Sequence, residues 1–164
     1  MSKENRLSQL VGKVNKLPEG IRTWALSTII GRVVRFAGTA GTKVLKLTPN
    51  ECIIVMPNKK KAQNHIGSVH AAAMALMAES ATGFITGLSV PDSRILVIRS
   101  MELEYIRRAT GDMKAVASFT DEQIAYIKNT EKGDIEVPVV MTDSTGTETV
   151  KARMVWAWTP KKKA

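Results

Sequence analysis

The sequence has few of the residues that mark several large classes of protein. Cys52 is the single cysteine among 164 residues, so an internal disulfide framework is excluded. Free thiols persist in reducing compartments, and we therefore expect a cytoplasmic protein. No apolar run approaches the roughly 18 residues that a membrane span needs, and the N-terminal segment lacks the apolar core of a signal peptide. We accordingly expect no stable membrane insertion.

Aromatic residues are also scarce, at 5% of the chain, although the net charge is +9. Residues 1–64 hold twelve Lys and Arg against three Glu, whereas residues 65–164 hold twelve basic and twelve acidic side chains. Sequence-specific binding of RNA combines aromatic with basic side chains, and no such motif is present. We expect no nucleic-acid partner. The basic excess is expected to serve an anionic small ligand, with plain solubility as the alternative for any single lysine.

The first part of the chain predicts helices. Residues 3–16 show the pattern of a short amphipathic helix that Pro18 interrupts. A second helix opens at 19–20 and extends to residue 38, because apolar residues recur there at steps of three and four. We expect this stripe to pack on the domain's own sheet, with a membrane surface as the alternative, given Trp24 and the nearby arginines. The stripe comprises Leu26, Ile29, Ile30, Val33, Val34 and Ala37.

From residue 42 onward the period changes to that of strands, interrupted by one long apolar helix. We expect that helix to run from about Gly67 to Gly83 or slightly beyond, with a bulge or break near Ser100 in the next strand. Strands joined by turns pair antiparallel, so the economical packing is a curved antiparallel sheet wrapped around the helix, an α+β architecture. We expect a single domain, 1–164, with an N-terminal helical arm (1–38) and a core (42–158). Its expected strands are 42–48, 51–57, 93–109, 113–119, 135–141 and 150–158, with a short helix at 121–129.

The segment NHIGSVHAAAMALMAES, residues 64–80, opens the long helix and carries one carboxylate, Glu79. An isolated carboxylate on so apolar a helix costs several kcal/mol unless another group pairs with it or uses it. The first amides of a helix lack acceptors, so those near His70 and Ala71 can polarise a carbonyl oxygen, and Asn64 can hold that carbonyl or a water. Glu79 lies about 12 Å further along the axis and cannot touch a group held at its own helix start. We therefore predict that an antiparallel helix of a second copy places its Glu79 opposite Ala71.

The pattern Asn64-x5-His70-Ala71-x7-Glu79, which opens a helix after two strands, resembles the hotdog-fold thioesterases, in the branch typified by phenylacetyl-CoA thioesterase. The run NHIGSVHAAA is more similar still to an uncharacterised branch of that superfamily that bears the thioesterase label. EYIRRATGDMKAVASF also resembles the strand pair that follows in this family, so the resemblance covers about residues 42–158. It implies a hotdog fold, with extra N-terminal helices outside the common core, and a homodimer or a tetramer.

The resemblance also implies an activity, the hydrolysis of an acyl-CoA or acyl-carrier thioester at a site shared between two subunits. The CoA thioester is then the substrate, and no cofactor is expected. Two departures bear on the chemistry: Ala71 and Ala72 replace the glycines of the family pattern, and Glu79 replaces the more common Asp. The first change is mild because the family uses a backbone N–H there, whereas the longer acid moves the carboxylate outward.

Two sets of residues are expected to act on the thioester. The catalytic set is Glu79, Asn64, His70 and Ala71. Glu79 is the general base or nucleophile, and we expect Thr82 and Thr86, on the same helix face, to hold its carboxylate or a water. The basic run Lys59–Lys61 is expected to contact the phosphates of CoA. The full set of predicted substrate contacts is His65, Gly67, Ser68, Thr82, Thr86, Lys59, Lys60 and Lys61.

Other interpretations of the same residues stay open. His65 and Glu79 lie fourteen residues apart, as in hotdog hydroxyacyl-thioester dehydratases, although the proline-glycine elements of those enzymes are missing between them. A non-catalytic acyl-binding protein would keep the fold without turnover. A metal site is not expected, because His65, His70 and Glu79 lack the four-residue step of a helical ligand pair. Taken singly, His70 could be a core histidine, and Asn64 or Ser68 a helix cap.

Overall fold

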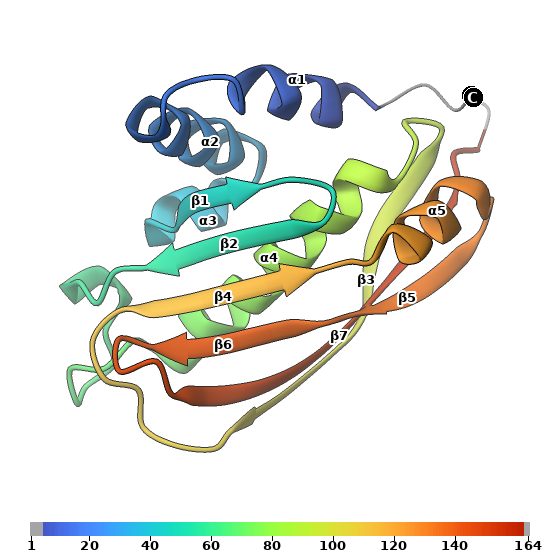
Figure 1. Ribbon diagram of the computed structural model, residues 1–164. Coiled ribbons are helices and arrows are strands. Elements are labelled where there is room, and N and C mark those ends of the chain that lie inside the picture. Colours follow the sequence, from blue (N-terminus) through green and yellow to red (C-terminus); the bar gives the residue numbers. More distant parts are fainter. Residues whose placement is uncertain (1–4, 163–164) are drawn as a thin grey trace.

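One antiparallel sheet curves around the long helix α4 in the computed structural model, which describes residues 5–162 (Figure 1). The strand order across the sheet is β1-β2-β4-β6-β7-β3, and β5 pairs with the second half of β7. This is the α+β architecture that the sequence predicts. The helices are α1 (Arg6–Val14), α2 (Glu19–Val33), α3 (Arg35–Ala40), α4 (Ala71–Ser89) and α5 (Asp121–Asn129), with a 3-10 turn η1 (Lys60–Ala62). The strands are β1 (Lys43–Leu47), β2 (Glu51–Met56), β3 (Arg94–Tyr105), β4 (Met113–Ser118), β5 (Gly133–Val137), β6 (Val139–Asp143) and β7 (Glu148–Pro160).

Helix α4 forms the core of the molecule, and the sheet covers most of its surface. Met77, Ala81 and Ile85 have no exposed surface, and the facing side chains of β2, such as Ile54 and Met56, are equally buried. Each large apolar side chain buried in this way contributes about 1.5–3 kcal/mol to folding. By length and composition α4 could cross a membrane, so the expectation that no apolar run approaches that length is wrong. Most of α4 is buried inside the sheet, which is the usual situation of a core helix.

Helix α4 begins and ends later than the periodicity predicts. The predicted start, Gly67, lies instead in a tight loop with φ +76°, where the Asn64 side chain accepts two backbone N–H groups. The helix starts only at Ala71. Gly83 does not end the helix, which continues to Ser89. The ring of Trp156 packs so closely on Gly83 that a Cβ atom on this glycine would lie 2.6 Å from the ring. Gly83 therefore serves the close packing of α4 on β7.

The strand that follows α4 carries the bulge expected near Ser100. β3 pairs with β7 along its length, but the register shifts between Ile98 and Ser100. A bulge inserts one residue and so reverses which later side chains face the core. Beyond it, Met101 lines a hollow together with residues of α4, and the Tyr105 hydroxyl donates a hydrogen bond to the Ala71 carbonyl oxygen at 2.8 Å. The bulge thus supplies two side chains to the start of α4.

The strand predicted over 135–141 is two strands, so five strands and not four follow α4. Pro138 separates them; it has no N–H for a sheet ladder and interrupts the pairing. β5 pairs with the end of β7, whereas β6 pairs with β4 and with the beginning of β7. Val137 and Met141 are both buried, so the predicted alternation holds on each side of the break.

The N-terminal helices α1 and α2 lie beyond β1, at that edge of the sheet (Figure 1). α1 confirms the first predicted helix, of which residues 3 and 4 lie outside the described part of the chain. Leu26 and Ile30 of α2 are buried as predicted. The amide of Val44 in β1 donates to Ser27 Oγ at 2.9 Å, so α2 caps a backbone donor of the first strand.

The second predicted helix breaks at Val34, where φ is −112° and ψ is 87°. The short helix α3 follows, packed against α2 through Gly31 and Gly38; a Cβ atom on Gly38 would lie 2.7 Å from the Gly31 carbonyl oxygen. Val33, predicted to lie on the buried stripe, is 65% exposed, because it sits in the last turn before the break. The apolar stripe therefore packs on two different surfaces. Its α2 part packs on the sheet, and its α3 part packs on the open face of α4.

Candidate active site

His70 is the N-cap of α4, and its ring takes the role that Ser or Asn usually has. Its Nδ1 accepts from the Ala72 amide at 3.0 Å, and its own amide donates to the Ala62 carbonyl oxygen at 2.7 Å. Among the amides of residues 70–73, that of Ala71 alone finds no acceptor within residues 5–162. One free N–H therefore remains at the positive end of the helix dipole, where an oxygen that gains negative charge is stabilised.

A hollow of about 310 Å³ opens beside Ala71, lined also by Asn64, Ser68, Tyr105 and Arg108; we call it the helix-start hollow. Asn64 Oδ1 is held by two loop amides, at 3.1 Å each, so its Nδ2 is the end left for a ligand. Arg108 Nε donates to Ser68 Oγ at 3.1 Å, which ties this loop to the chain after β3. Neither Asn64 nor Ser68 caps the helix.

A second hollow, of about 360 Å³, lies on the open face of α4 and contains the predicted catalytic carboxylate. We call it the Glu79 hollow. Apart from Glu79 its lining is apolar and comes from α3 with the residue before it, from α4 and from β3. The lining residues are Val34, Phe36, Ala72, Ala75, Leu76, Glu79 and Met101.

The Glu79 carboxylate is partly buried and weakly hydrogen-bonded. Ser80 Oγ donates to Oε2 at 3.3 Å, and Glu79 takes part in no ion pair within residues 5–162. Burial raises the pKa of Glu79 above the usual range of a glutamate, and the Ser80 hydrogen bond lowers it by less. A carboxylate of raised pKa in an open hollow is a stronger proton acceptor than an exposed one.

The structure places the two halves of the predicted site in two different hollows, which adjoin the first turn of α4 at neighbouring residues. Ala71 lines the helix-start hollow, whereas its neighbour Ala72 lines the Glu79 hollow. Asn64 belongs to the first hollow and Glu79 to the second. A single chain therefore does not bring Asn64 and Glu79 together.

Thr82 and Thr86 do not hold the Glu79 carboxylate, contrary to the expectation from their spacing. Thr82 Oγ1 donates to the Ala78 carbonyl oxygen at 2.7 Å and accepts from Trp156 Nε1 at 2.8 Å. Thr86 Oγ1 donates to the Thr82 carbonyl oxygen at 2.7 Å. Both threonines are fully buried on the side of α4 that faces the sheet. Thr82 thus joins the helix to β7.

The remaining predicted substrate contacts surround the helix start. Lys59 and Lys60 are exposed, whereas Lys61 Nζ donates to the Thr39 carbonyl oxygen at the end of α3, at 3.0 Å. His65 is exposed and lines neither hollow. The Gly67 carbonyl oxygen accepts from Asn58 Nδ2 at 3.0 Å.

Several residues of the site were not predicted. Tyr105, Arg107 and Arg108 line the helix-start hollow, and Phe36 and Met101 line the Glu79 hollow. The run EYIRR was the available signal for the first three, because an arginine pair directly after a strand places its charge at the end of a sheet. Nothing in the pattern around Phe36 separates it from the other apolar residues of its helix.

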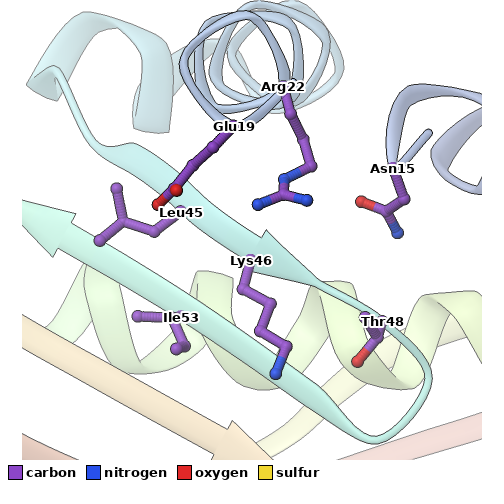
Figure 2. Close-up of a pocket in the computed structure, with 7 residues that line it drawn as sticks. All are labelled: Asn15, Glu19, Arg22, Leu45, Lys46, Thr48 and Ile53. Carbon is purple, nitrogen blue, oxygen red and sulfur yellow. The ribbon is translucent and has the colours of Figure 1, made fainter. Parts of the chain in front are cut away.

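A third and larger hollow, of about 490 Å³, lies away from these residues, between α2 and the outer surface of β1 and β2. Figure 2 shows Glu19 and Arg22 reaching from α2 toward Leu45, Lys46 and Ile53 of the hairpin. Lys46 is paired with the Glu51 carboxylate at 2.6 Å. This hollow contains none of the predicted site residues. Residues 5–162 also contain no cluster of three His, Cys, Asp or Glu side chains that could hold a metal ion.

The curved sheet, the central helix and the solved structures that share them define the class of this protein. Several similar solved structures carry the word thioesterase in their names, including ones from Pseudomonas aeruginosa, Shewanella oneidensis and Haemophilus influenzae. One from Pseudomonas aeruginosa is 23% identical, with 88% of this chain and 97% of that one covered and a TM-score of 0.74. One from Shewanella oneidensis is 12% identical, with 84% of this chain and 97% of that one covered and a TM-score of 0.71. One from Haemophilus influenzae is also 12% identical, with 78% of this chain and 85% of that one covered and a TM-score of 0.65. The protein shares the fold of these structures, the hotdog fold, as predicted.

Within that class the chain belongs to the family DUF4442, a domain of unknown function, which matches residues 22–158. The match begins inside α2, so α3 lies within the family domain. A comparison with curated protein sequences returned no match.

Proposed function

We propose that this protein hydrolyses acyl thioesters of CoA or of an acyl carrier, with Glu79 as general base or nucleophile at a site shared by two copies of the chain. The observation that carries the proposal is the Glu79 hollow, an apolar hollow on the open face of α4 that contains one carboxylate. Fatty and aromatic acyl groups are apolar, and their thioester carbonyl needs a proton acceptor or nucleophile beside it. The thioesterase names of the structural neighbours agree with this chemistry.

The free edge of β3 supports a second copy. Within the described chain β3 pairs only with β7, so the backbone groups of its other edge have no strand beside them. Ile95 and Val97 on its outer face are also exposed. An uncovered strand edge of this length invites pairing with another chain. β3 runs antiparallel to α4, since Tyr105 contacts Ala71 and the later turns of α4 lie by the start of β3. A symmetric β3–β3 pair would therefore set two α4 helices antiparallel across the axis.

The proposed reaction divides its roles between the two hollows. The free N–H of Ala71 stabilises the oxyanion that forms when the thioester carbonyl is attacked. Glu79 of the second copy either takes a proton from the attacking water or attacks the carbon itself, and the thiolate leaves and is protonated. In the second case the acyl group is left on Glu79 as an anhydride, which a water then hydrolyses to release the acid and restore the carboxylate. The products are a carboxylic acid and a free thiol. Lys59 and Lys60, which are exposed, are the proposed phosphate contacts. A cytoplasmic location stays a prediction.

The test is release of free thiol from short, medium, long and aromatic acyl-CoAs, measured for the wild-type protein and for Glu79→Gln. We expect Glu79→Gln to lose at least 10²-fold in kcat/KM, the lower range for removal of an acid–base catalyst, while it keeps the oligomeric state. Ser80→Ala is the matched control, because it removes the hydrogen bond to Glu79 and leaves the carboxylate; its activity should stay within severalfold of wild type. Equal turnover by wild type and Glu79→Gln would contradict the assignment of the carboxylate.

A further inference from the structure

Helix α3 reaches the Glu79 hollow from outside the central helix and the sheet. Val34, just before α3, and Phe36 within it line the hollow opposite Ala75 and Glu79 of α4. Phe36 is nevertheless 65% exposed. An aromatic ring that lines an apolar hollow and still has most of its surface in water has room beside it for another apolar group.

The position of α3 is fixed by contacts on its other sides. Ala37 is fully buried, and its carbonyl oxygen accepts from Thr42 Oγ1 at 2.9 Å. Gly38 packs against the backbone of α2, and Lys61 Nζ holds the Thr39 carbonyl oxygen at 3.0 Å. The backbone that carries Phe36 is therefore held from three directions, although the ring itself is open. A fixed wall of this kind can set the size of a ligand.

We propose that α3 forms the end wall of the acyl-binding pocket and that Phe36 sets the length of the acyl group that the enzyme accepts. The inference rests on the proposed thioesterase function and adds a substrate class: thioesters of an uncharged, apolar acyl group that runs from Glu79 toward Phe36. An acyl group with a terminal carboxylate would place a second negative charge among Val34, Leu76 and Met101, which offer it no hydrogen-bond donor.

The acyl group, and not a second copy of the chain, is the occupant that the hollow fits. Glu79 lies in the same hollow, so side chains of a second copy that filled it would seal the carboxylate from any substrate. The free edge of β3 offers a second copy a surface of its own. An apolar chain that ends at Phe36 leaves its thioester end beside Glu79.

The experiment measures thiol release over a series of saturated acyl-CoAs from four to sixteen carbons. We expect Phe36→Ala to shift the preferred length upward and Phe36→Trp to shift it downward. For Phe36→Ala, kcat/KM for a chain two carbons longer than the wild-type optimum should rise about fifteenfold relative to that optimum, because each newly buried methylene contributes about fourfold. Trp24→Ala is the matched control: Trp24 is an aromatic residue of α2 that is 69% exposed and does not line the hollow.

Each outcome supports or overturns the proposal that α3 forms the end wall of the acyl-binding pocket. An unchanged length profile in an active Phe36→Ala enzyme overturns the inference and leaves the thioesterase function in place. If the wild type turns over no thioester, binding of non-hydrolysable acyl-CoA thioethers is measured by titration calorimetry. If the acyl length with the lowest Kd differs between wild type and Phe36→Ala, the wall is supported although the thioesterase function fails. The same preferred length in wild type and Phe36→Ala overturns the inference. Dissociation of Phe36→Ala into monomers with equal loss at all lengths would also overturn it, because Phe36 would then belong to the subunit interface.

Discussion

At the scale of single residues, Glu79 combines an ionisable carboxyl group with a position on an apolar helix. Its position on an apolar helix makes the charged form costly, and burial accordingly raises its pKa. The structure gives it one long hydrogen bond, from Ser80, and no cationic partner within residues 5–162. A group that destabilises the fold in its charged form is retained for chemistry more readily than for stability.

This property predicts how stability depends on pH. Because the pKa of Glu79 is raised in the folded state, the folded protein binds this proton more tightly than the unfolded chain. The contribution of Glu79 is therefore full below the ordinary glutamate pKa, about 4.3, and is lost as the pH rises through the raised value. We expect the urea midpoint of Glu79→Gln to exceed that of wild type at pH 8 and to approach it near pH 4. A lower midpoint for Glu79→Gln at pH 8 would mean that the carboxylate has a stabilising partner.

At the scale of elements, periodicity predicted α4 and the strands well, because burial on one face is what shapes a pattern of period two or 3.6. Periodicity failed where a helix packs against more than one part of the molecule. The stripe through Val34 continues without a gap in the sequence, although the helix breaks there and the later residues turn toward α4. Thr82 was assigned to the face of Glu79, but a helix wrapped by a sheet has partners on nearly every face, and Thr82 bonds Trp156.

The motif could name the residues around the helix start, whereas the residues that tertiary packing brings to them were missed. His70 and Ala71 mark a helix start, which a sequence pattern can locate. Arg108 acts by tying Ser68 to the end of β3, forty residues away along the chain. The run EYIRR places its charge at the end of a sheet but does not identify Ser68 as its partner. Cys52 is fully buried, and burial raises its pKa, so the thiolate does not form near neutral pH.

Substitutions of His70, the cap of α4, distinguish a capping role of this residue from a role of its ring as acid or base. His70→Ala removes the acceptor for the Ala72 amide and should lower the free energy of unfolding by about 1 kcal/mol. His70→Ser supplies a hydroxyl in the same cap and should recover most of that loss. We expect thiol release to follow the cap, so that Ser restores activity and Ala costs less than Glu79→Gln. A stable His70→Ser protein as inactive as Glu79→Gln would show that the ring itself acts as acid or base.

At the scale of the whole molecule, the two edges of the sheet differ in a way that predicts assembly. α2 covers β1 and satisfies a backbone donor of that strand through Ser27, whereas β3 leaves its outer edge open. The two hollows adjoin the first turn of α4 at neighbouring residues, each with half of the proposed machinery. A second copy joined at β3 would both close the edge and bring one Glu79 to the other helix start.

Mixing two inactive variants tests this arrangement. Ala71→Pro deletes only the free N–H, since proline is tolerated at the first helical position and that amide has no acceptor within residues 5–162. In a heterodimer of Ala71→Pro with Glu79→Gln, a shared site has one intact copy, made of the normal helix start of one chain and the normal carboxylate of the other. Refolding an equal mixture from urea should therefore restore about a quarter of wild-type thiol release, because half of the dimers are mixed and each has one intact site of two. Each variant refolded alone is the control. If each chain instead completed its own site, no mixed dimer would hold an intact one and the mixture would stay inactive.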